Sequence, residues 1–177
     1  MGQYYYVINL DKRQYLHPHR AGDGLKLLEF ACSANGTMTC LAVLLADGNG
    51  RGGGDLGSDD PVVGSWAGDR IVISGDYADA LKFVDDATLA VYRDKCMTDA
   101  PAADHEEIQA SKPTLQSVAD KLFEDITTKV LVALADDRWL RDHMVEQANS
   151  YLFGQTLKES PELRAKLGVT VSVGAES

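Results

Sequence analysis

The sequence predicts an α+β protein: a small antiparallel or mixed sheet with short helices and a Gly-rich loop in the N-terminal half, and a helical C-terminal half packed on it. The first observation is that 13 of the 16 glycines lie in residues 1–84, because glycine favours turns over long helices. The second is that apolar residues in 85–177 recur at the three- and four-residue spacing of helices. We therefore expect a Gly-rich α+β region at 1–84 and a mainly helical region at 85–177, both in one domain.

Bulk composition narrows the class of protein. The 177 residues are 45% hydrophobic and 25% charged, which is ordinary for a globular chain and excludes a collagen or a disulfide scaffold. The longest apolar run, Leu41 to Ala46, is far shorter than the roughly 20 residues of a membrane span. The three cysteines include no C-x-x-C pair, so we expect reduced thiols. The N-terminus lacks a signal-peptide pattern, and we expect a soluble cytoplasmic protein.

The N-terminal region is expected to form a hairpin and a third strand around one long loop. Tyr4 to Leu10 is rich in aromatic and β-branched residues and predicts a strand. Gln14 to His17 is expected to pair back on it across a short turn. The other expected segments are helices at 25–30 and 37–46, a loop at 47–64 and a strand at 70–74.

The C-terminal region is expected to consist of helices. Apolar residues from Leu115 to Leu134 keep helical spacing and predict one long helix, whose stripe is either core or a partner surface. Asp136 and Asp137 are expected to end it and to cap the next helix, which continues through Tyr151. The other expected segments are helices at 79–84 and 88–96, a polar connector at 100–113, a helix from Pro161 to Gly168 and an edge strand at 169–173.

Two histidines flank Pro18 in the first polar cluster. In an extended segment, the side chains of His17 and His19 leave the same face. Imidazoles are metal ligands, and either ring can also serve as a general base because histidine titrates near neutrality. The alternative is a pair of surface or hydrogen-bonded histidines at the end of a hairpin.

The long loop carries a second cluster, which runs from Arg51 to Asp55. Glycines such as Gly53 let the backbone approach a ligand closely and expose N–H groups to an anion, and Arg51 could clamp a carboxylate or phosphate. The segment departs from a calcium-binding loop because Arg51 occupies a ligand position. A surface loop without a ligand remains the alternative.

The third cluster surrounds the predicted strand at 70–74. Asp69, Arg70 and Asp76 suit turns and Asp79 suits a helix cap. If Asp76 and Asp79 meet Asp55 or His17 in space, they form a carboxylate-rich site for a divalent cation or for acid–base chemistry. Just before the cluster, Trp66 is either a stacking platform for a ring or a core residue.

Negative charge is unevenly distributed. The chain has a formal charge of −10, and residues 85–137 hold twelve acids against five bases. Such a segment repels a phosphate backbone, so direct nucleic-acid binding is not expected. A basic protein surface is the partner that this charge favours.

Residues 2–80 contain an ordered series of motifs. They are Gly2-Gln3-Tyr4-Tyr5, Asn9-Leu10-Asp11-Lys12, Tyr15-Leu16-His17-Pro18-His19, Gly24-Leu25-Lys26-Leu27, Leu44-Leu45-Ala46-Asp47, Arg51-Gly52-Gly53-Gly54-Asp55, Gly64-Ser65-Trp66-Ala67-Gly68-Asp69-Arg70 and Gly75-Asp76-Tyr77-Ala78-Asp79. This series resembles a family of small uncharacterised bacterial and phage-borne proteins. The resemblance implies a family but no activity, and no residue role is carried over from it.

The sequence leaves several functions open. The first is a polar small-ligand site, either anion-binding or metal-assisted and either enzymatic or not. A divalent cation is its possible cofactor, with His17, His19, Asp55 and Asp76 as candidate ligands. The second is an acidic phage-type or counter-defence protein that binds a basic partner surface, and the third is a structural protein that oligomerises through its helices. The full set of candidate ligand-binding residues is His17, His19, Arg51, Gly53, Asp55, Trp66, Asp69, Arg70, Asp76 and Asp79.

Overall fold

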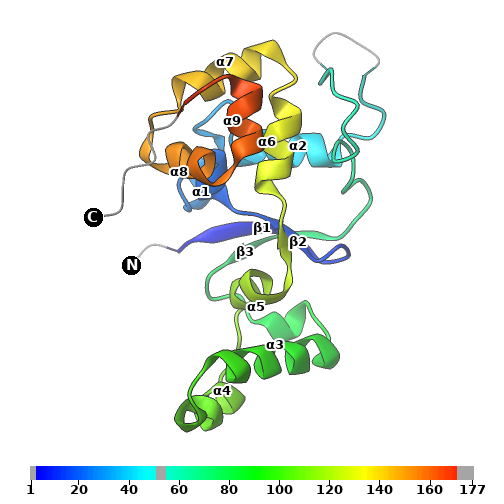
Figure 1. Cartoon of the computed structure of the whole chain (residues 1–177). Helices are drawn as coiled ribbons and strands as arrows, with labels where there is room; N and C mark the ends of the chain where they lie inside the picture. Colours follow the sequence, from blue (N-terminus) through cyan, green and yellow to red (C-terminus); the bar gives the residue numbers. More distant parts are fainter. Residues whose placement is uncertain (1–2, 51–54, 171–177) are drawn as a thin grey trace, which may run out of the picture. The chain divides into compact units, whose positions relative to one another are not determined.

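A computed structural model describes residues 3–50 and 55–170. The fold is α+β, as the sequence predicts. Its described part contains a four-stranded mixed sheet with the order β3-β1-β2-β4, together with α- and 3-10 helices (Figure 1). None of the described helices is both long and apolar enough to cross a bilayer.

Two compact units make up the chain. Unit 1 contains residues 1–15 and 69–125, and unit 2 contains residues 16–68 and 126–177. Each unit therefore draws on both the Gly-rich region and the helical region that the sequence distinguishes. The contact-based division and the compositional division are different partitions of the chain.

The strands of unit 1 form around the predicted hairpin. β1 (Tyr5–Asn9) pairs antiparallel with β3 (Ile71–Gly75), and β2 (Gln14–Leu16) pairs parallel with β4 (Glu124–Asp125). In the turn before β2, Arg13 takes a positive φ of 54°. The predicted strands at 4–10, 14–17 and 70–74 are confirmed to within one residue at each end.

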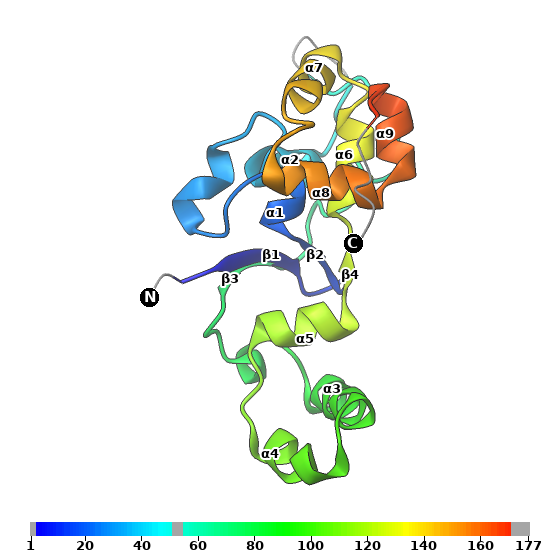
Figure 2. The same ribbon diagram turned by 60° about the vertical axis from the view of Figure 1, so that its left-hand side comes forward.

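The helices of unit 1 follow β3 in the chain. They are η2 (Ala80–Lys82), α3 (Asp86–Asp99), η3 (Ala102–Asp104), α4 (His105–Ala110) and α5 (Leu115–Leu122). Figure 2 shows α5 beside the strands, and α3 packs against both α4 and α5. The expected helix at 79–84 is only a 3-10 turn. The expected connector at 100–113 is wrong, because it contains η3 and α4.

The single long helix expected from Leu115 to Leu134 is also wrong. Phe123 is extended, with φ −100° and ψ 161°, and the chain then pairs with β2 before the helix resumes. The Glu124 N–H donates to the Arg13 carbonyl at 3.0 Å. A long-range backbone contact therefore interrupts a stretch whose apolar spacing is helical throughout.

Unit 2 is a helical cluster around α6. Six of the eight α6 residues are buried, and α6 packs against α1, α2 and α9 (Figure 1). The elements are α1 (Pro18–Ala21), η1 (Leu27–Ala31), α2 (Thr37–Leu45), α6 (Thr127–Leu134), α7 (Arg138–Glu146), α8 (Tyr151–Glu159) and α9 (Pro161–Leu167).

Helix caps set several boundaries in unit 2. The Asp137 carboxylate accepts from the Leu140 N–H at 2.9 Å and caps α7 as predicted. Pro161 begins α9, and Gly168 ends it in a left-handed conformation, also as predicted. The helix expected to continue through Tyr151 is divided instead, because Ser150 caps a separate helix, α8. The edge strand expected at 169–173 lies largely outside the described residues.

Candidate functional site

The histidine pair lies at the start of α1 in unit 2. His17 occupies the cap position of α1, and its N–H donates to Thr127 Oγ1 at 2.8 Å. The extended presentation expected for His17 and His19 is wrong, because Pro18 begins a helix. The rings nevertheless lie close, with centroids 5.5 Å apart. Burial lowers the pKa of His19, against the raising effect of the Glu29 charge.

The described part of the chain does not gather the expected metal ligands into a cluster. Within residues 3–50 and 55–170, no three His, Cys, Asp or Glu side chains lie together in a group able to hold a metal ion. His17, His19 and Asp55 belong to unit 2, whereas Asp76 belongs to unit 1. Arg51 and Gly53 lie outside the described residues, so the expected anion cradle is not part of the site described below.

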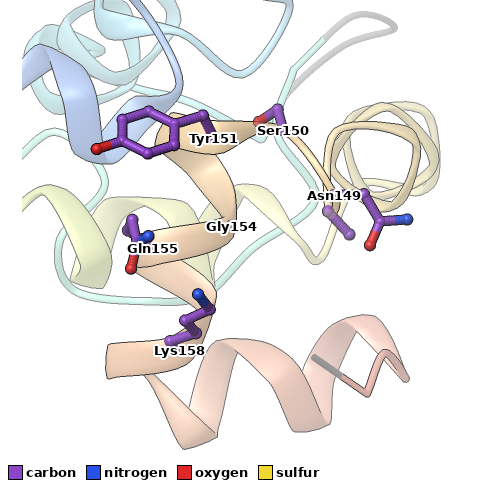
Figure 3. Close-up of a pocket in the computed structure, with 7 residues that line it drawn as sticks. Asn149, Ser150, Tyr151, Gly154, Gln155 and Lys158 are labelled. Carbon is purple, nitrogen blue, oxygen red and sulfur yellow. The ribbon is translucent and has the colours of Figure 1, made fainter. Parts of the chain in front are cut away.

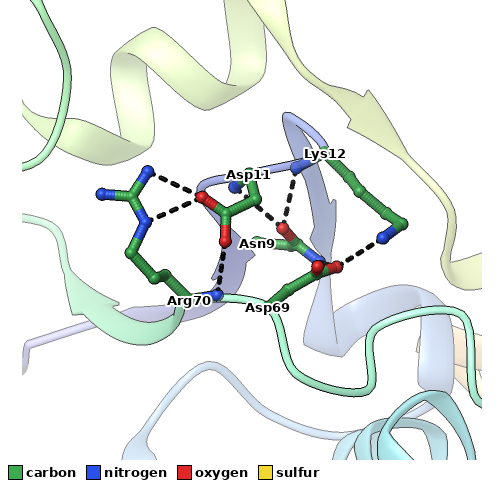
Figure 4. Close-up of polar contacts among 5 residues, drawn as sticks. All are labelled: Asn9, Asp11, Lys12, Asp69 and Arg70. Carbon is green, nitrogen blue, oxygen red and sulfur yellow. Dashed lines mark hydrogen bonds and ion pairs between the residues drawn. The ribbon is translucent and has the colours of Figure 1, made fainter.

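Asp69 and Arg70 belong to a polar network in unit 1 (Figure 4). Asp69 accepts from Lys12 Nζ at 2.7 Å and from Asn9 Nδ2 at 2.8 Å. The Arg70 guanidinium and backbone N–H bind the Asp11 carboxylate, with Nε 2.7 Å from Oδ1 and N 2.8 Å from Oδ2. These residues hold the β1–β2 turn against the start of β3, which is the turn role that the sequence allowed.

The charges of this network are mutually compensated. Hydrogen bonds from Arg70 hold the pKa of Asp11 below its ordinary value, and hydrogen bonds from Lys12 and Asn9 do the same for Asp69. Each carboxylate therefore stays ionised beside its own cation. The network is better suited to fixing the turn than to binding a further ligand.

The remaining predicted aspartates of unit 1 follow β3. Asp79 accepts from the Leu81 N–H at 3.0 Å and caps η2, as its structural interpretation expected. The buried Asp76 Oδ1 has no hydrogen-bond partner among the described residues, and the Asp76 N–H donates to the Tyr4 carbonyl at 2.9 Å.

Trp66 is a core residue of unit 2. Its exposure is 0%, and its backbone N–H donates to the Leu44 carbonyl at 2.8 Å. Two residues earlier, the Gly64 N–H donates to the Val43 carbonyl at 2.9 Å. These bonds satisfy carbonyls near the end of α2 that the helix itself leaves open. The stacking platform proposed for Trp66 is therefore wrong, because no face of the indole is exposed.

Asp55 lies in the long loop, which is held by several side-chain bonds. Asn49 binds both backbone groups of Leu56, through Nδ2 at 2.8 Å and Oδ1 at 2.9 Å. The Asp55 carboxylate accepts from the Gly50 N–H at 3.1 Å. Further along, Ser58 Oγ donates to Asp136 at 2.6 Å. The first two residues hold the described parts of the loop together, and Ser58 ties the loop to Asp136 between α6 and α7.

A groove over α2 lies beside these contacts, and we call it the α2 groove. It consists of two adjoining cavities of about 400 and 530 Å³, a size typical of small-ligand sites. Both are lined by Thr39, Val43, Asp55 and Leu56. The other described lining residues are Ala34, Met38, Ala42, Ala46, Asn49, Asp137, Trp139 and Leu140.

Trp139 supplies an accessible aromatic ring to the α2 groove. Leu140 and Met144 form the buried face of α7, and Trp139 and His143, one turn apart, lie on the adjoining face beside it. The centroids of the Trp139 and His143 rings lie 4.4 Å apart, and Trp139 is 60% exposed. Sequence reasoning missed Trp139, although an indole on the polar face of an amphipathic helix was a usable signal.

A second, smaller hollow lies on α8, and we call it the α8 hollow (Figure 3). Its volume is about 290 Å³. The sequence does not predict it, since the spacing of its residues indicates a helix and carries no signal of a site. It is lined by Ala148, Asn149, Ser150, Tyr151, Gly154, Gln155 and Lys158.

Comparisons with known proteins identify no family for this chain. No protein-family model, no curated protein and no solved structure matches the chain.

Proposed function

We propose that the protein binds a small organic cation in the α2 groove. The lining of the groove carries this proposal. Among the described residues it combines the carboxylates of Asp55 and Asp137 with an exposed indole and apolar side chains, and it includes no Lys, Arg or His. A hollow with this lining favours a positive ligand charge.

The two parts of the lining suit two parts of a ligand. Val43, Leu56 and Leu140 offer an apolar surface for a ring or an alkyl body. The indole of Trp139 attracts a cation through its ring face, which is worth about 0.5–1 kcal/mol at an exposed position. A charge-assisted hydrogen bond to a carboxylate adds about 1.5–3 kcal/mol. The ligand class is therefore an amine or amidine attached to an apolar body.

Three probes that differ mainly in charge test the proposal: benzamidinium, benzamide and benzoate. We expect benzamidinium to change the fluorescence of Trp139 and to saturate with a Kd on the order of 1 mM, typical for so few atoms. Benzamide should bind about tenfold more weakly because it lacks the charge. Benzoate should bind no more tightly than benzamide at this groove.

Variants of the same loop provide the control. Asp55→Asn should weaken benzamidinium binding about five- to tenfold, in line with the loss of one charge-assisted bond. Asp47→Asn makes the same charge change at an exposed loop position outside the lining, and should leave binding unchanged. Equal effects of the two variants, or equal binding of benzamidinium and benzoate, would reject the cation site.

A second candidate function is association with a basic protein surface through α3 and α4. Only Thr88 and Leu89 of α3 are buried, and α4 has no buried residue. Charge complementarity would speed association and make it sensitive to salt. The exposed carboxylates are Asp86, Asp94, Asp99, Asp104, Glu106 and Glu107.

Poly-L-lysine is a suitable probe for this second function. Replacing Glu106 and Glu107 by glutamine should weaken binding of the polymer at low salt, because the change removes two charges from α4. Replacing Asp142 and Glu146 of α7 by their amides changes the net charge equally and should have less effect. The same loss in both double variants would instead indicate a response to total charge.

A further inference from the structure

The α8 hollow is separate from the α2 groove and has the opposite charge character. We infer that it binds a small planar organic anion, a carboxylate or phosphate attached to one ring. Lys158 is the only charged residue among its lining residues. The Lys158 ammonium forms no ion pair within residues 3–50 and 55–170, so its charge is available to a ligand.

The faces of α8 explain where the hollow lies. Phe153, Thr156 and Leu157 are buried against the rest of unit 2. Tyr151, Gln155 and Lys158 are exposed on the other side, at spacings that place them on one helix face. In Figure 3, the Lys158 amine turns back toward Gly154, as expected for a helical side chain that slopes toward the N-terminus.

Gly154 also lines the hollow, but it is itself buried, next to the Ala148 carbonyl. A glycine inside a helix costs roughly 0.5–1 kcal/mol relative to alanine, so its place in the second turn of α8 needs a reason. A Cβ at Gly154 would lie 3.2 Å from the Ala148 carbonyl oxygen, which is a tight contact. The missing side chain lets the Ala148 carbonyl lie close to α8, which brings the 148–150 corner beside Lys158 in the lining. A larger residue at this position would press on this corner and disturb the hollow.

The other lining groups suit the ligand class. Gln155, Asn149 and Ser150 present polar groups that can donate hydrogen bonds to anionic oxygens. Tyr151 is 82% exposed, and its ring can stack on a planar ring at the usual 4.5–7 Å between centroids. At about 290 Å³, the hollow lies near the lower end of the roughly 300–1,000 Å³ of small-ligand sites. One ring with one anionic group therefore matches its size.

Amide chemical-shift mapping with benzoate on the full chain tests this inference. We expect benzoate to shift the amide signals of residues 149–158 and to saturate with a Kd on the order of a few mM. Lys158→Gln should weaken binding at least about fivefold, the scale of one charge-assisted hydrogen bond. Lys26→Gln, the same change at an exposed lysine outside the hollow, should leave binding unaltered. Benzamidinium should not shift these signals.

Gly154→Leu provides an independent check, because its side chain should press on the Ala148 carbonyl, displace the 148–150 corner of the lining and so remove benzoate binding. An unchanged dispersion of the amide signals away from α8 must first show that this variant is folded. If the variant does not fold, Lys158→Gln decides the question, because it alters only an exposed side chain. Benzoate shifts outside residues 149–158, or equal binding by Lys158→Gln and wild type, would overturn the inference. Benzamidinium is expected to shift the amide signals of different residues, those of the α2 groove. The experiments can therefore reject one of the two sites without rejecting the other.

Discussion

Replacing Trp66 by alanine is expected to lower the free energy of unfolding by about 3–5 kcal/mol, the range for removing a large aromatic side chain from a core. The indole is fully buried in unit 2, and the segment that carries it is bonded to the end of α2. The lost contacts and the remaining cavity both contribute to the cost. Urea denaturation followed by circular dichroism measures the change.

Trp139→Ala is the matched control, because it removes the same side chain from a 60% exposed position in the same unit. It should change the free energy of unfolding by less than about 1 kcal/mol, since surface substitutions usually have small effects. A small effect of Trp66→Ala, comparable to that of Trp139→Ala, would contradict the core assignment. It would also restore the stacking role that the sequence left open for Trp66.

Replacing Asp23 by alanine is expected to lower the free energy of unfolding by about 2–4 kcal/mol, because each buried donor left unpaired costs about 1–3 kcal/mol. Asp23 is 1% exposed. It accepts from the Ser33 N–H at 3.1 Å and from the Thr37 N–H, at the start of α2, at 2.6 Å. Asp47→Ala, at an exposed loop position, should have little effect in the same denaturation experiment.

The same carboxyl group gives a pH dependence with a defined sign. Burial raises the pKa of Asp23 above its ordinary value of 3.8, although hydrogen bonds from Thr37 and Ser33 oppose the shift. The folded state therefore favours the protonated form. The contribution of Asp23 to stability is fully present below pH 3.8 and is lost as the pH rises through its folded-state pKa.

Asp23→Asn isolates this effect, because the amide cannot ionise. The free energy of unfolding of wild type, relative to that of Asp23→Asn, should fall as the pH rises from about 3 toward 7. The upper end of this interval lies above the ordinary carboxyl pKa. Denaturation of both proteins at several pH values measures it. A relative stability that rises with pH would show that the hydrogen bonds outweigh burial.

Local signals were sufficient for much of the fold. The hairpin of β1 and β2, the α7 cap at Asp137 and the α9 boundaries at Pro161 and Gly168 depend on neighbouring residues, and sequence reasoning placed them. The interruption between α5 and α6 depends on pairing with β2, more than 100 residues away in the chain. Apolar spacing carries no information about such a contact, and it predicted one continuous helix.

The candidate site was harder to predict for the same reason. Asp55 was identified from its glycine-rich loop, and it lines the α2 groove. Asp69 and Arg70 were identified by the same type of pattern, but they are bound to partners near the β1–β2 turn. Trp139 and Thr39 belong to helices, where the exposed face resembles any solvated face. Their meeting at the groove depends on how α2 and α7 pack in unit 2.

Amide chemical-shift mapping with benzamidinium is the most direct test of a cation site in the α2 groove. We expect saturable shifts concentrated at the lining residues of α2, at Asp55 and Leu56, and at the first turn of α7. Benzamide should produce the same pattern more weakly. Shifts spread over the acidic surface of the chain, or confined to residues outside this lining, would contradict the cation site.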